Sequence, residues 1–521
     1  MRTKQSRYRK FDSRWTRTSF GEPAYGFSYL RYLPDSPSAA FAGVRIALIL
    51  GRSSIQFGDR MENRTPRFAP DEGQGTTMNS LERPIRTTTA LQRRAHELIP
   101  GGSHTYAKGD DQYPISAPPF IVRGEGCRVW DLEGHEYIEY GMGNRAVGLG
   151  HAYPRVIDAV RRELVNGCNF TRPSAIEVAC AEQFLSLIDG QDMVKFCKDG
   201  SDATSAAVRL ARAYTGRNFI ARCGDHPFFS TDDWFIGTTA MSSGIPKDVS
   251  GLTLSFPYHD LDAVRSLFDE YPNKIAAIIL EAARMEEPAE GYLQGLADLC
   301  HDNGALLIFD EMITGFRWDN GGAQKVYGVT PDLSCFGKAL ANGFSVSALA
   351  GKREFMRLGG IDHTDRQRVF LLSTTHGAET HALAAAIATM REYEEQPVIE
   401  AIYRLGSRLA SGFNDAIKRH GLEDYVEVMG RPCCLIYATR DGGKNPSQAM
   451  RTLFLQETIK RGVLAPSLVV SYAHRENDID QTLDAIDGAL EIYARALEDG
   501  VESYLVGRPS QPVFRAFNGE G

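Results

Sequence analysis

The sequence predicts an α/β protein with a mostly parallel sheet covered by helices on both faces. Buried-strand patterns alternate with amphipathic helical segments through the middle of the chain, and this rhythm is typical of a parallel sheet. A smaller α+β unit is expected beyond about residue 400. With 521 residues and 43% apolar content, the chain can bury a large core and form two or more domains.

The first predicted elements precede the parallel rhythm. A helix is expected at residues 88–98, because Pro100-Gly101-Gly102 would end it. Residues 120–140 alternate between apolar and polar side chains, which predicts a small antiparallel sheet turned at Glu133-Gly134. A helix at about 153–166 follows.

The middle of the chain supplies the parallel sheet. Its expected strands are 194–197, 218–223, 275–280 and 305–309, and its expected helices are 202–214, 261–271 and 291–303. In the smaller unit, we expect helices at 402–419, 447–460 and 478–497 and strands at 426–428 and 433–437. No internal repeat is present.

Charge is distributed unevenly along the chain. Residues 1–77 hold 13 Lys and Arg against 7 Asp and Glu, and the remainder holds 45 against 59, which gives about +6 and −14. The acidic remainder gives no indication of a nucleic-acid partner. The basic opening has the composition of a targeting segment but lacks an apolar h-region. We favour the alternative that translation begins at Met78 and that residues 1–77 are disordered.

The cysteines and apolar runs exclude other classes of protein. The nine cysteines form no Cys-x-x-Cys pair and no His/Cys cluster with zinc spacing, so we expect reduced thiols in a cytoplasmic protein and no metal. The apolar run 41–50 is too short to span a bilayer and contains Arg45. We therefore expect no membrane partner.

Lys338 and Asp310 carry the strongest indication of chemistry. Lys338 lies between Gly337 and a run of small residues, where the backbone can pack closely around a flat cofactor. Asp310 ends a predicted buried strand and could face the ring nitrogen of that cofactor. A Schiff-base lysine with an anionic partner for a pyridinium is what pyridoxal phosphate chemistry requires. Taken singly, each residue is more often a surface lysine or a strand-capping aspartate.

Gly200-Ser201-Asp202 stands at the start of the helix expected at 202–214. Free N–H groups approached past a glycine form an anion site, to which Ser201 adds a hydroxyl. The same residues also make an ordinary helix cap. The chain has no Walker loop, because Gly337-Lys338 lacks the upstream glycine and the following Ser or Thr.

A series of short motifs runs in order from about Glu97 to Leu497. They are residues 98–102, 130–137, 149–154, 199–204 with 209–217, 279–281, 309–317, 336–338 and 373–377. In this order they resemble the class III (fold type I) pyridoxal phosphate aminotransferases, and within them the glutamate-1-semialdehyde 2,1-aminomutase branch. The resemblance implies a large cofactor-binding domain at 161–400, a small domain built from 78–160 and 401–500, and a tail at 501–521.

The resemblance also implies roles for the candidate residues. Lys338 would bind the cofactor as a Schiff base and move the substrate proton, and Asp310 would keep the pyridinium nitrogen protonated. Met312, two residues along the same strand, would pack against the ring. The other implied contacts are Gly200, Ser201 and Asp202 at the phosphate, Glu281 near the cofactor hydroxyl, and Thr375 at the phosphate of the neighbouring subunit. The last contact implies a homodimer with sites at its interface.

Departures from the family concern the substrate and the ring face. Asp225 stands where the family has a ring-stacking aromatic residue, and we prefer His226 over Phe228 as its replacement. Near the family's carboxylate-binding arginine the chain has Lys108, which cannot offer a planar fork.

Two further substrate-side positions differ. Asn144-Arg145 replaces a Trp-Gly pair, and Arg145 could restore an anchor for a carboxylate or phosphate. The stretch 464–474 lacks a glutamate that the aminomutases carry.

The sequence therefore predicts a homodimeric aminotransferase that moves an amino group from an amino-acid donor to an aldehyde or keto acceptor through a pyridoxamine phosphate form. The polar replacements suit a hydroxylated or sugar-like acceptor. One alternative is the aminomutase itself, which moves an amino group between adjacent carbons. A racemase or decarboxylase on the same scaffold, or a non-catalytic binding protein, are further alternatives; the intact Lys338, Asp310 and Gly200-Ser201 argue against the last.

Overall fold

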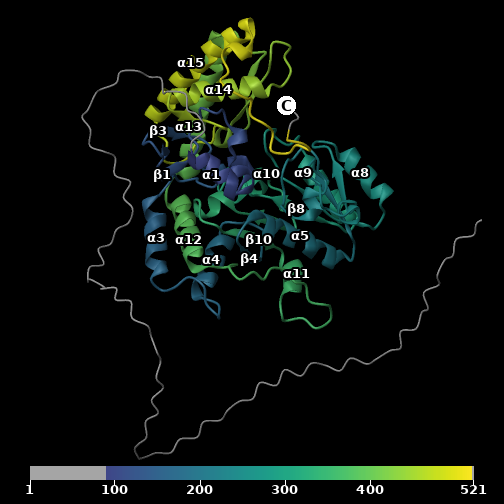
Figure 1. The fold of residues 1–521 in the computed structure, drawn as a ribbon. Coiled ribbons are helices and arrows are strands. Elements are labelled where there is room, and N and C mark those ends of the chain that lie inside the picture. Colours follow the sequence, from purple (N-terminus) through teal and green to yellow (C-terminus); the bar gives the residue numbers. More distant parts are fainter. Residues whose placement is uncertain (1–89, 519–521) are drawn as a thin grey trace, which may run out of the picture. The chain divides into compact units, whose positions relative to one another are not determined.

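The computed structural model describes residues 90–518. Its larger part has a seven-stranded sheet at the centre (Figure 1). The strand order is β4-β10-β9-β8-β7-β5-β6. The strands are β4 (Met193–Cys197), β5 (Phe219–Cys223), β6 (Thr253–Phe256), β7 (Ile275–Leu280), β8 (Leu306–Asp310), β9 (Leu333–Phe336) and β10 (Ser347–Gly351). In this sheet β10 runs opposite to the other six strands, which are all parallel to one another. The predicted mostly parallel sheet is confirmed.

Helices cover both faces of this sheet, because successive strand residues point to opposite sides. Leu306 and Ile308 of β8 pack in one apolar cluster with the alanine-rich face of α5 (Gly200–Thr215). Leu307 and Phe309 pack in another cluster, with α8 (Leu261–Glu270) and α9 (Tyr292–Asp302). The inner strands are therefore buried on both sides, as the sequence predicted.

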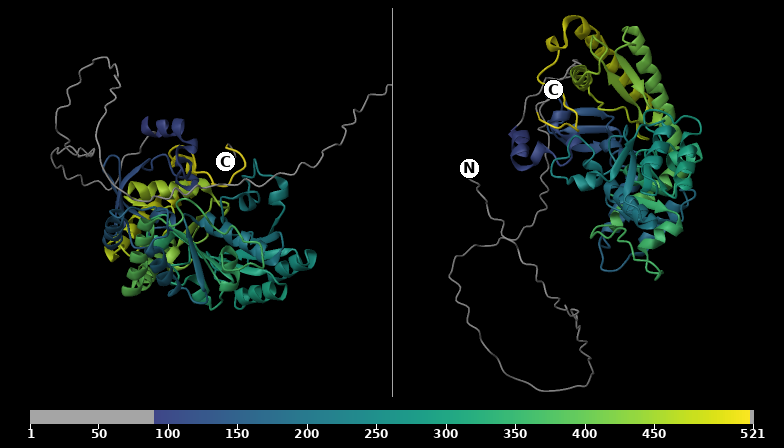
Figure 2. Two further views of the ribbon diagram at one scale, coloured as in Figure 1. Left: turned by 90° about the horizontal axis from the view of Figure 1, so that it is seen from below. Right: turned by 90° about the vertical axis from the view of Figure 1, so that its right-hand side faces the viewer.

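A four-stranded sheet unites the two ends of the described chain. Strands β1 (Ile121–Glu125), β2 (Arg128–Asp131) and β3 (Glu136–Glu139) are antiparallel, and β13 (Val463–Leu464) pairs with β3 in parallel. Arg128 of β2 contacts Asp478 of α15 (Glu476–Asp499) at 2.5 Å. In Figure 2, the purple N-terminal strands accordingly lie against the yellow C-terminal part.

The other elements follow the prediction in some places and depart from it in others. The remaining strands are β11 (Val426–Met429) and β12 (Ile436–Thr439), and the remaining helices are α1 (Ala90–Leu98), α2 (Met142–Arg145), α3 (Pro154–Leu164), α4 (Ala175–Leu185), α6 (Asp233–Ile236), α7 (Lys247–Ser250), α10 (Gly322–Tyr327), α11 (Arg353–Met356), α12 (Thr380–Glu395), α13 (Val398–Arg419) and α14 (Gln448–Lys460). The strand expected at 433–437 starts later, because Pro432 opens a short 3-10 helix, Pro432–Cys434. The expectations for residues 1–77 lie outside the described residues.

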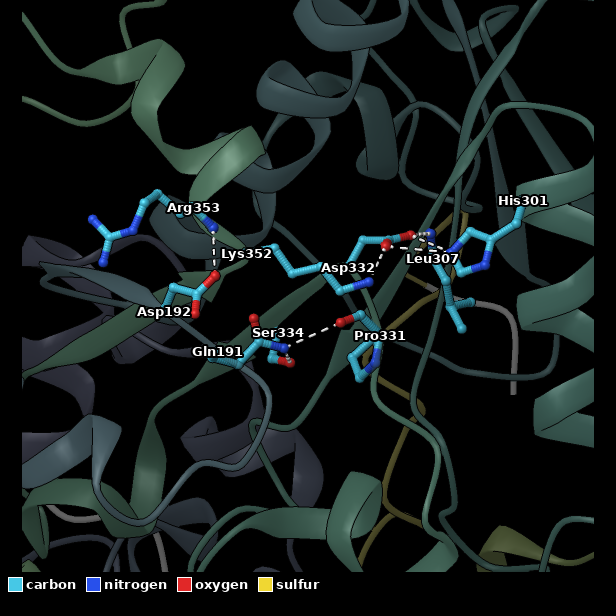
Figure 3. Close-up of polar contacts among 9 residues, drawn as sticks. All are labelled: Gln191, Asp192, His301, Leu307, Pro331, Asp332, Ser334, Lys352 and Arg353. Carbon is cyan, nitrogen blue, oxygen red and sulfur yellow. Dashed lines mark hydrogen bonds and ion pairs between the residues drawn. The ribbon is translucent and has the colours of Figure 1, made fainter. Parts of the chain in front are cut away.

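Asp332 anchors the start of β9, the strand that leads to Lys338 (Figure 3). Its buried carboxylate accepts hydrogen bonds from the Leu307 N–H at 2.9 Å and from Lys352 Nζ at 2.8 Å, and it lies 3.2 Å from His301 Nε2. Beside it, Gln191 Nε2 donates to the Pro331 carbonyl at 3.1 Å. The Asp332 contacts link the start of β9 to Leu307 of β8, to His301 of α9 and to Lys352, which directly follows β10. This is the end of β9 opposite Lys338.

The cysteines and the helices of residues 90–518 bear on the expectations of reduced thiols and of no membrane partner. All nine cysteines are unpaired, and eight of them are buried. No helix in this part of the chain is both long and apolar enough to cross a membrane.

Candidate active site

Lys338 begins a 3-10 helix, Lys338–Ala341, directly after β9 and Gly337. A Cβ atom on Gly337 would lie 2.5 Å from Ser347 Oγ and 2.6 Å from Met312 Sδ, so a side chain there would displace both groups. Lys338 itself has φ of 46°, a left-handed conformation that is costly for a residue with a side chain. The backbone therefore fixes the lysine tightly at the end of the strand.

Two buried carboxylates share the surroundings of Lys338. Asp310 ends β8 and Glu281 follows β7, and both are about 95% buried. Burial and the charge of Glu281 raise the pKa of Asp310 to about 7, against the opposing effect of Lys338. Burial lowers the pKa of Lys338, and the two carboxylates oppose that shift. The structure thus brings together three residues separated by up to 57 positions in the sequence.

Glu281 has unused hydrogen-bonding capacity. Burial raises its pKa, while Arg284, Lys338 and Arg145 oppose the shift. Its Oε2 atom is buried without a hydrogen-bond partner among residues 90–518. A buried polar atom without a partner is costly and often marks a position that a ligand completes.

The start of α5 leaves some groups for an anion and commits others. Ser201 Oγ accepts a hydrogen bond from the Thr231 N–H at 3.0 Å. The Asp202 N–H donates to the side chain of Asp199 at 2.9 Å, and its carboxylate accepts from the Lys198 N–H at 3.2 Å. The Gly200 and Ser201 N–H groups therefore suit an anion better than Asp202 does.

Met312 lies beside Gly200 and Gly337, but it is not in the strand. β8 ends at Asp310, so the prediction that Met312 continues the same strand was wrong. The Met312 N–H turns back and donates to Asp310 Oδ1 at 2.9 Å, which ends the extended conformation. A Cβ atom on Gly200 would lie 3.0 Å from Met312 Sδ, so the thioether packs directly against the start of α5.

His226 is enclosed near Glu281. Its Nδ1 atom accepts a hydrogen bond from the Glu281 N–H at 3.1 Å. Burial, followed by the charge of Arg284, lowers the pKa of His226 to about 3, so its ring is neutral. Phe228 is 44% exposed, and Asp225 accepts a hydrogen bond from the Tyr258 N–H at 2.6 Å.

The candidate substrate residues are divided between a cavity and the surroundings of Lys338. A cavity of about 590 Å³ is lined by Lys108 and Asn144, together with parts of α1 and β3. Arg145 lies next in sequence to Asn144, and its charge acts on Lys338 and Glu281. α2 thus borders the cavity at Asn144, and the charge of its next residue, Arg145, acts on Lys338.

Backbone strain is present in α2. Met142, Gly143, Asn144 and Arg145 have φ of 42°, 58°, 56° and 71°, although only single residues usually adopt this left-handed conformation. Arg317 Nη2 donates to the Arg145 carbonyl at 2.6 Å and helps to hold the turn. Such strain is commonly found at functional sites.

Two arginines near the site were not predicted. Arg317 is 1% exposed, and its Nε and Nη1 atoms have no hydrogen-bond partner in the described chain. Arg284 acts on both Glu281 and His226. Arg317 ends the motif at residues 309–317, and Arg284 follows Glu281 by three residues. An arginine at either position does not indicate a functional residue until the fold is known.

Thr375 lies in a surface turn before α12. It is exposed, and its carbonyl accepts a hydrogen bond from Asn169 Nδ2 at 3.0 Å. Neighbouring residues Thr374 and Gly377 line a separate groove of about 460 Å³.

Comparison with known proteins decides the family. Residues 106–490 match the family model of the class III aminotransferases. The chain belongs to this family. It is 35% identical over 427 residues to a glutamate-1-semialdehyde 2,1-aminomutase from Desulforamulus reducens, an alignment that covers 77% of this chain and 97% of that one.

Solved structures agree with this assignment. The FumI protein of Sphingopyxis sp. MTA144, solved with PLP, is 29% identical with a TM-score of 0.72, covering 78% of this chain and 97% of that one. An omega-transaminase from Sphaerobacter thermophilus is 27% identical with a TM-score of 0.70, covering 79% and 98%. The fold is therefore that of the fold type I enzymes, and the protein is an enzyme of a pyridoxal phosphate-dependent family.

The described residues fit pyridoxal phosphate. Met312 Sδ lies close to both Gly200 and Gly337, where neither residue has a side chain. The unpartnered Glu281 Oε2 offers an acceptor, and buried Asp310 offers an anion for a ring nitrogen. A buried anion and an unused acceptor are thus available to hold the cofactor.

Proposed function

We propose that the protein is an aminotransferase that moves an amino group from an amino-acid donor to an aldehyde or keto acceptor. The observation that carries the proposal is the group of Lys338, Asp310 and Glu281 at neighbouring strand ends, together with a cavity of about 590 Å³ that α2 borders. Such a cavity has the size of an ordinary small-molecule site.

Each residue has a distinct role in this proposal. Pyridoxal phosphate, when bound, supplies an electron sink for removal of a proton from the carbon that carries the amino group. Lys338 would bind the cofactor and transfer that proton, since burial lowers its pKa and favours the neutral amine. Asp310 would hold the proton on the ring nitrogen, and Glu281 would contact the cofactor hydroxyl.

The remaining contacts position the cofactor. Gly200 and Ser201 would bind the phosphate through their N–H groups at the start of α5. Met312 and His226 would pack on the ring, and the neutral His226 suits a face-to-face contact. Asp202 would support the start of α5, because its N–H is bonded to the N-cap residue Asp199 and its carboxylate to the Lys198 N–H.

A homodimer in the cytoplasm belongs to the same proposal. Thr375 is exposed in the single chain, which agrees with a role in the site of a second subunit. The unpaired cysteines agree with a reducing compartment.

The aminomutase is the second candidate, because a curated relative of that name aligns over 97% of its length. Lys108 in place of an arginine and the missing glutamate in 464–474 argue against it.

One argument for a hydroxylated acceptor becomes weaker in the structure. The Asp225 carboxylate, one of the polar groups that suggested such an acceptor, already accepts a hydrogen bond from the Tyr258 N–H.

An absorption spectrum of the purified protein tests the proposal. We expect a visible band from bound pyridoxal phosphate that the Lys338→Ala variant lacks, and amino donors should bleach it to a stable form that an added carbonyl acceptor restores. Conversion of glutamate-1-semialdehyde to 5-aminolevulinate without any external donor would establish the aminomutase instead. A protein that binds no cofactor would contradict both.

A further inference from the structure

The described chain continues beyond residue 490, where the family match ends. Residues 504–515, which we call the C-terminal strap, follow α15 and bind α14. Gln456 Nε2 donates to the Tyr504 carbonyl at 3.0 Å, and Gln456 Oε1 accepts from the Val506 N–H at 2.8 Å. The Ser510 N–H donates to Thr452 Oγ1 at 2.8 Å. Because Gln456 and Thr452 are fully buried, this attachment is well defined.

The strap then crosses to the loop that contains Lys108. The Gln511 N–H donates to the Asp111 carbonyl at 2.8 Å, and Arg515 forms an ion pair with the Asp111 carboxylate at 2.8 Å. Arg508 Nη2 donates to the Asp110 carbonyl at 2.7 Å. Figure 2 shows the yellow C-terminal segment beside the purple N-terminal segment.

Arg508 lines the same cavity as Lys108. In the part of the chain that the structure describes, its guanidinium bonds only to the carbonyl oxygens of residues 110, 111 and 509. Neither Arg508 nor Lys108 forms an ion pair with a carboxylate within residues 90–518. Both positive charges on this wall therefore lack an anionic partner.

The acidic side chains of the cavity wall are already engaged. Asp110 Oδ2 accepts from Gln92 Nε2 at 2.8 Å and lies 3.0 Å from His96 Nε2. Glu139 Oε2 lies 3.0 Å from His151 Nε2. Each of these carboxylates thus bonds to a neighbouring side chain rather than to Arg508 or Lys108, which leaves both cations able to pair with an anionic ligand.

We propose that Arg508 is a specificity-determining residue that binds, together with Lys108, a carboxylate group carried by the carbonyl acceptor. A lysine gives a point charge, whereas a guanidinium gives the planar fork that matches a carboxylate. The strap thus supplies the fork that the loop at Lys108 lacks. This inference rests on the proposed aminotransferase function.

The test compares two acceptors on the holoenzyme, succinic semialdehyde with a carboxylate and butanal without one. We expect Arg508→Gln to lower kcat/KM for succinic semialdehyde by about 10- to 100-fold, mainly through KM, the usual effect of losing a hydrogen bond to a charged group. The value for butanal should change less than about twofold, since an uncharged acceptor makes no such bond. Arg508→Lys should recover part of the loss.

Arg495→Gln is the matched control, because Arg495 pairs with Glu491 on the surface of α15 away from the cavity. It should leave both acceptors unchanged. Equal losses for the two acceptors in Arg508→Gln, or no loss for either, would overturn the inference while leaving the aminotransferase proposal intact.

Binding of glutarate separates this inference from the function. Glutarate carries carboxylates but no reactive carbonyl, so calorimetry measures its binding without turnover. We expect the wild-type holoprotein to bind glutarate. The affinity of the Arg508→Gln variant should be lower by at least about tenfold. That result in a protein without transaminase activity would support the anion site and reject the function; equal affinities in the two proteins would reject the site.

Discussion

Two buried histidines are neutral because of where they lie. Burial lowers the pKa of His226 to about 3 and that of His474 to about 4, from an ordinary value of 6.5. His474 is fully buried, and its Nδ1 atom accepts a hydrogen bond from the Ser471 N–H at 3.0 Å. Between pH 6.5 and about 4 the unfolded chain binds a proton that the folded chain does not. The free energy of unfolding that neutral His474 contributes is therefore lost as pH falls through that window.

His474→Gln tests this linkage. The wild-type protein should lose about 2 kcal/mol of unfolding free energy at pH 5 because of His474, and the variant should not. Urea midpoints at pH 7 and pH 5 measure the effect, and the midpoint of the variant should fall less between the two pH values. A parallel fall in both proteins would show that His474 remains protonated or becomes hydrated in the folded state.

The polar contacts at the start of β9 act at the scale of an element. Asp332→Ala removes the buried acceptor of the Leu307 N–H and of Lys352, and we expect it to destabilise the protein by about 3 kcal/mol. The exposed pair Asp424–Lys444 is the control, since Asp424→Ala should cost less than about 1 kcal/mol. Urea midpoints of the two variants should differ clearly; equal midpoints would mean that Lys352 and Leu307 find other partners.

Helices and strands were predictable where their sequence shows one clear apolar pattern. The strands at β7 and β8 are continuous apolar runs, and the structure places both within a residue of the prediction. α12 was not predicted, because it is buried on nearly all sides and shows no apolar stripe. Lys338 and Asp310 could be chosen from motifs, whereas Arg284 and Arg317 could not, because their importance depends on which strand ends meet.

The whole molecule is expected to be complete only as a dimer. Thr375→Ala should weaken retention of pyridoxal phosphate during dialysis, because the phosphate would lose a hydroxyl donor from the second subunit. Mixing this variant with Lys338→Ala, and allowing subunits to exchange, should restore retention in sites that combine Lys338 of one chain with Thr375 of the other. Sedimentation measures the assembly, and a monomer, or exchange without recovery, would reject the shared site.

The pairing of β3 with β13 has a consequence for synthesis of the protein. Val463 pairs with Ile138, so one edge of the small sheet stays uncovered until more than 300 further residues have left the ribosome. Contacts this distant in sequence form slowly, and an uncovered strand edge can pair with another chain. A nascent or truncated chain that ends before Val463 is therefore the form most exposed to aggregation and to chaperone binding.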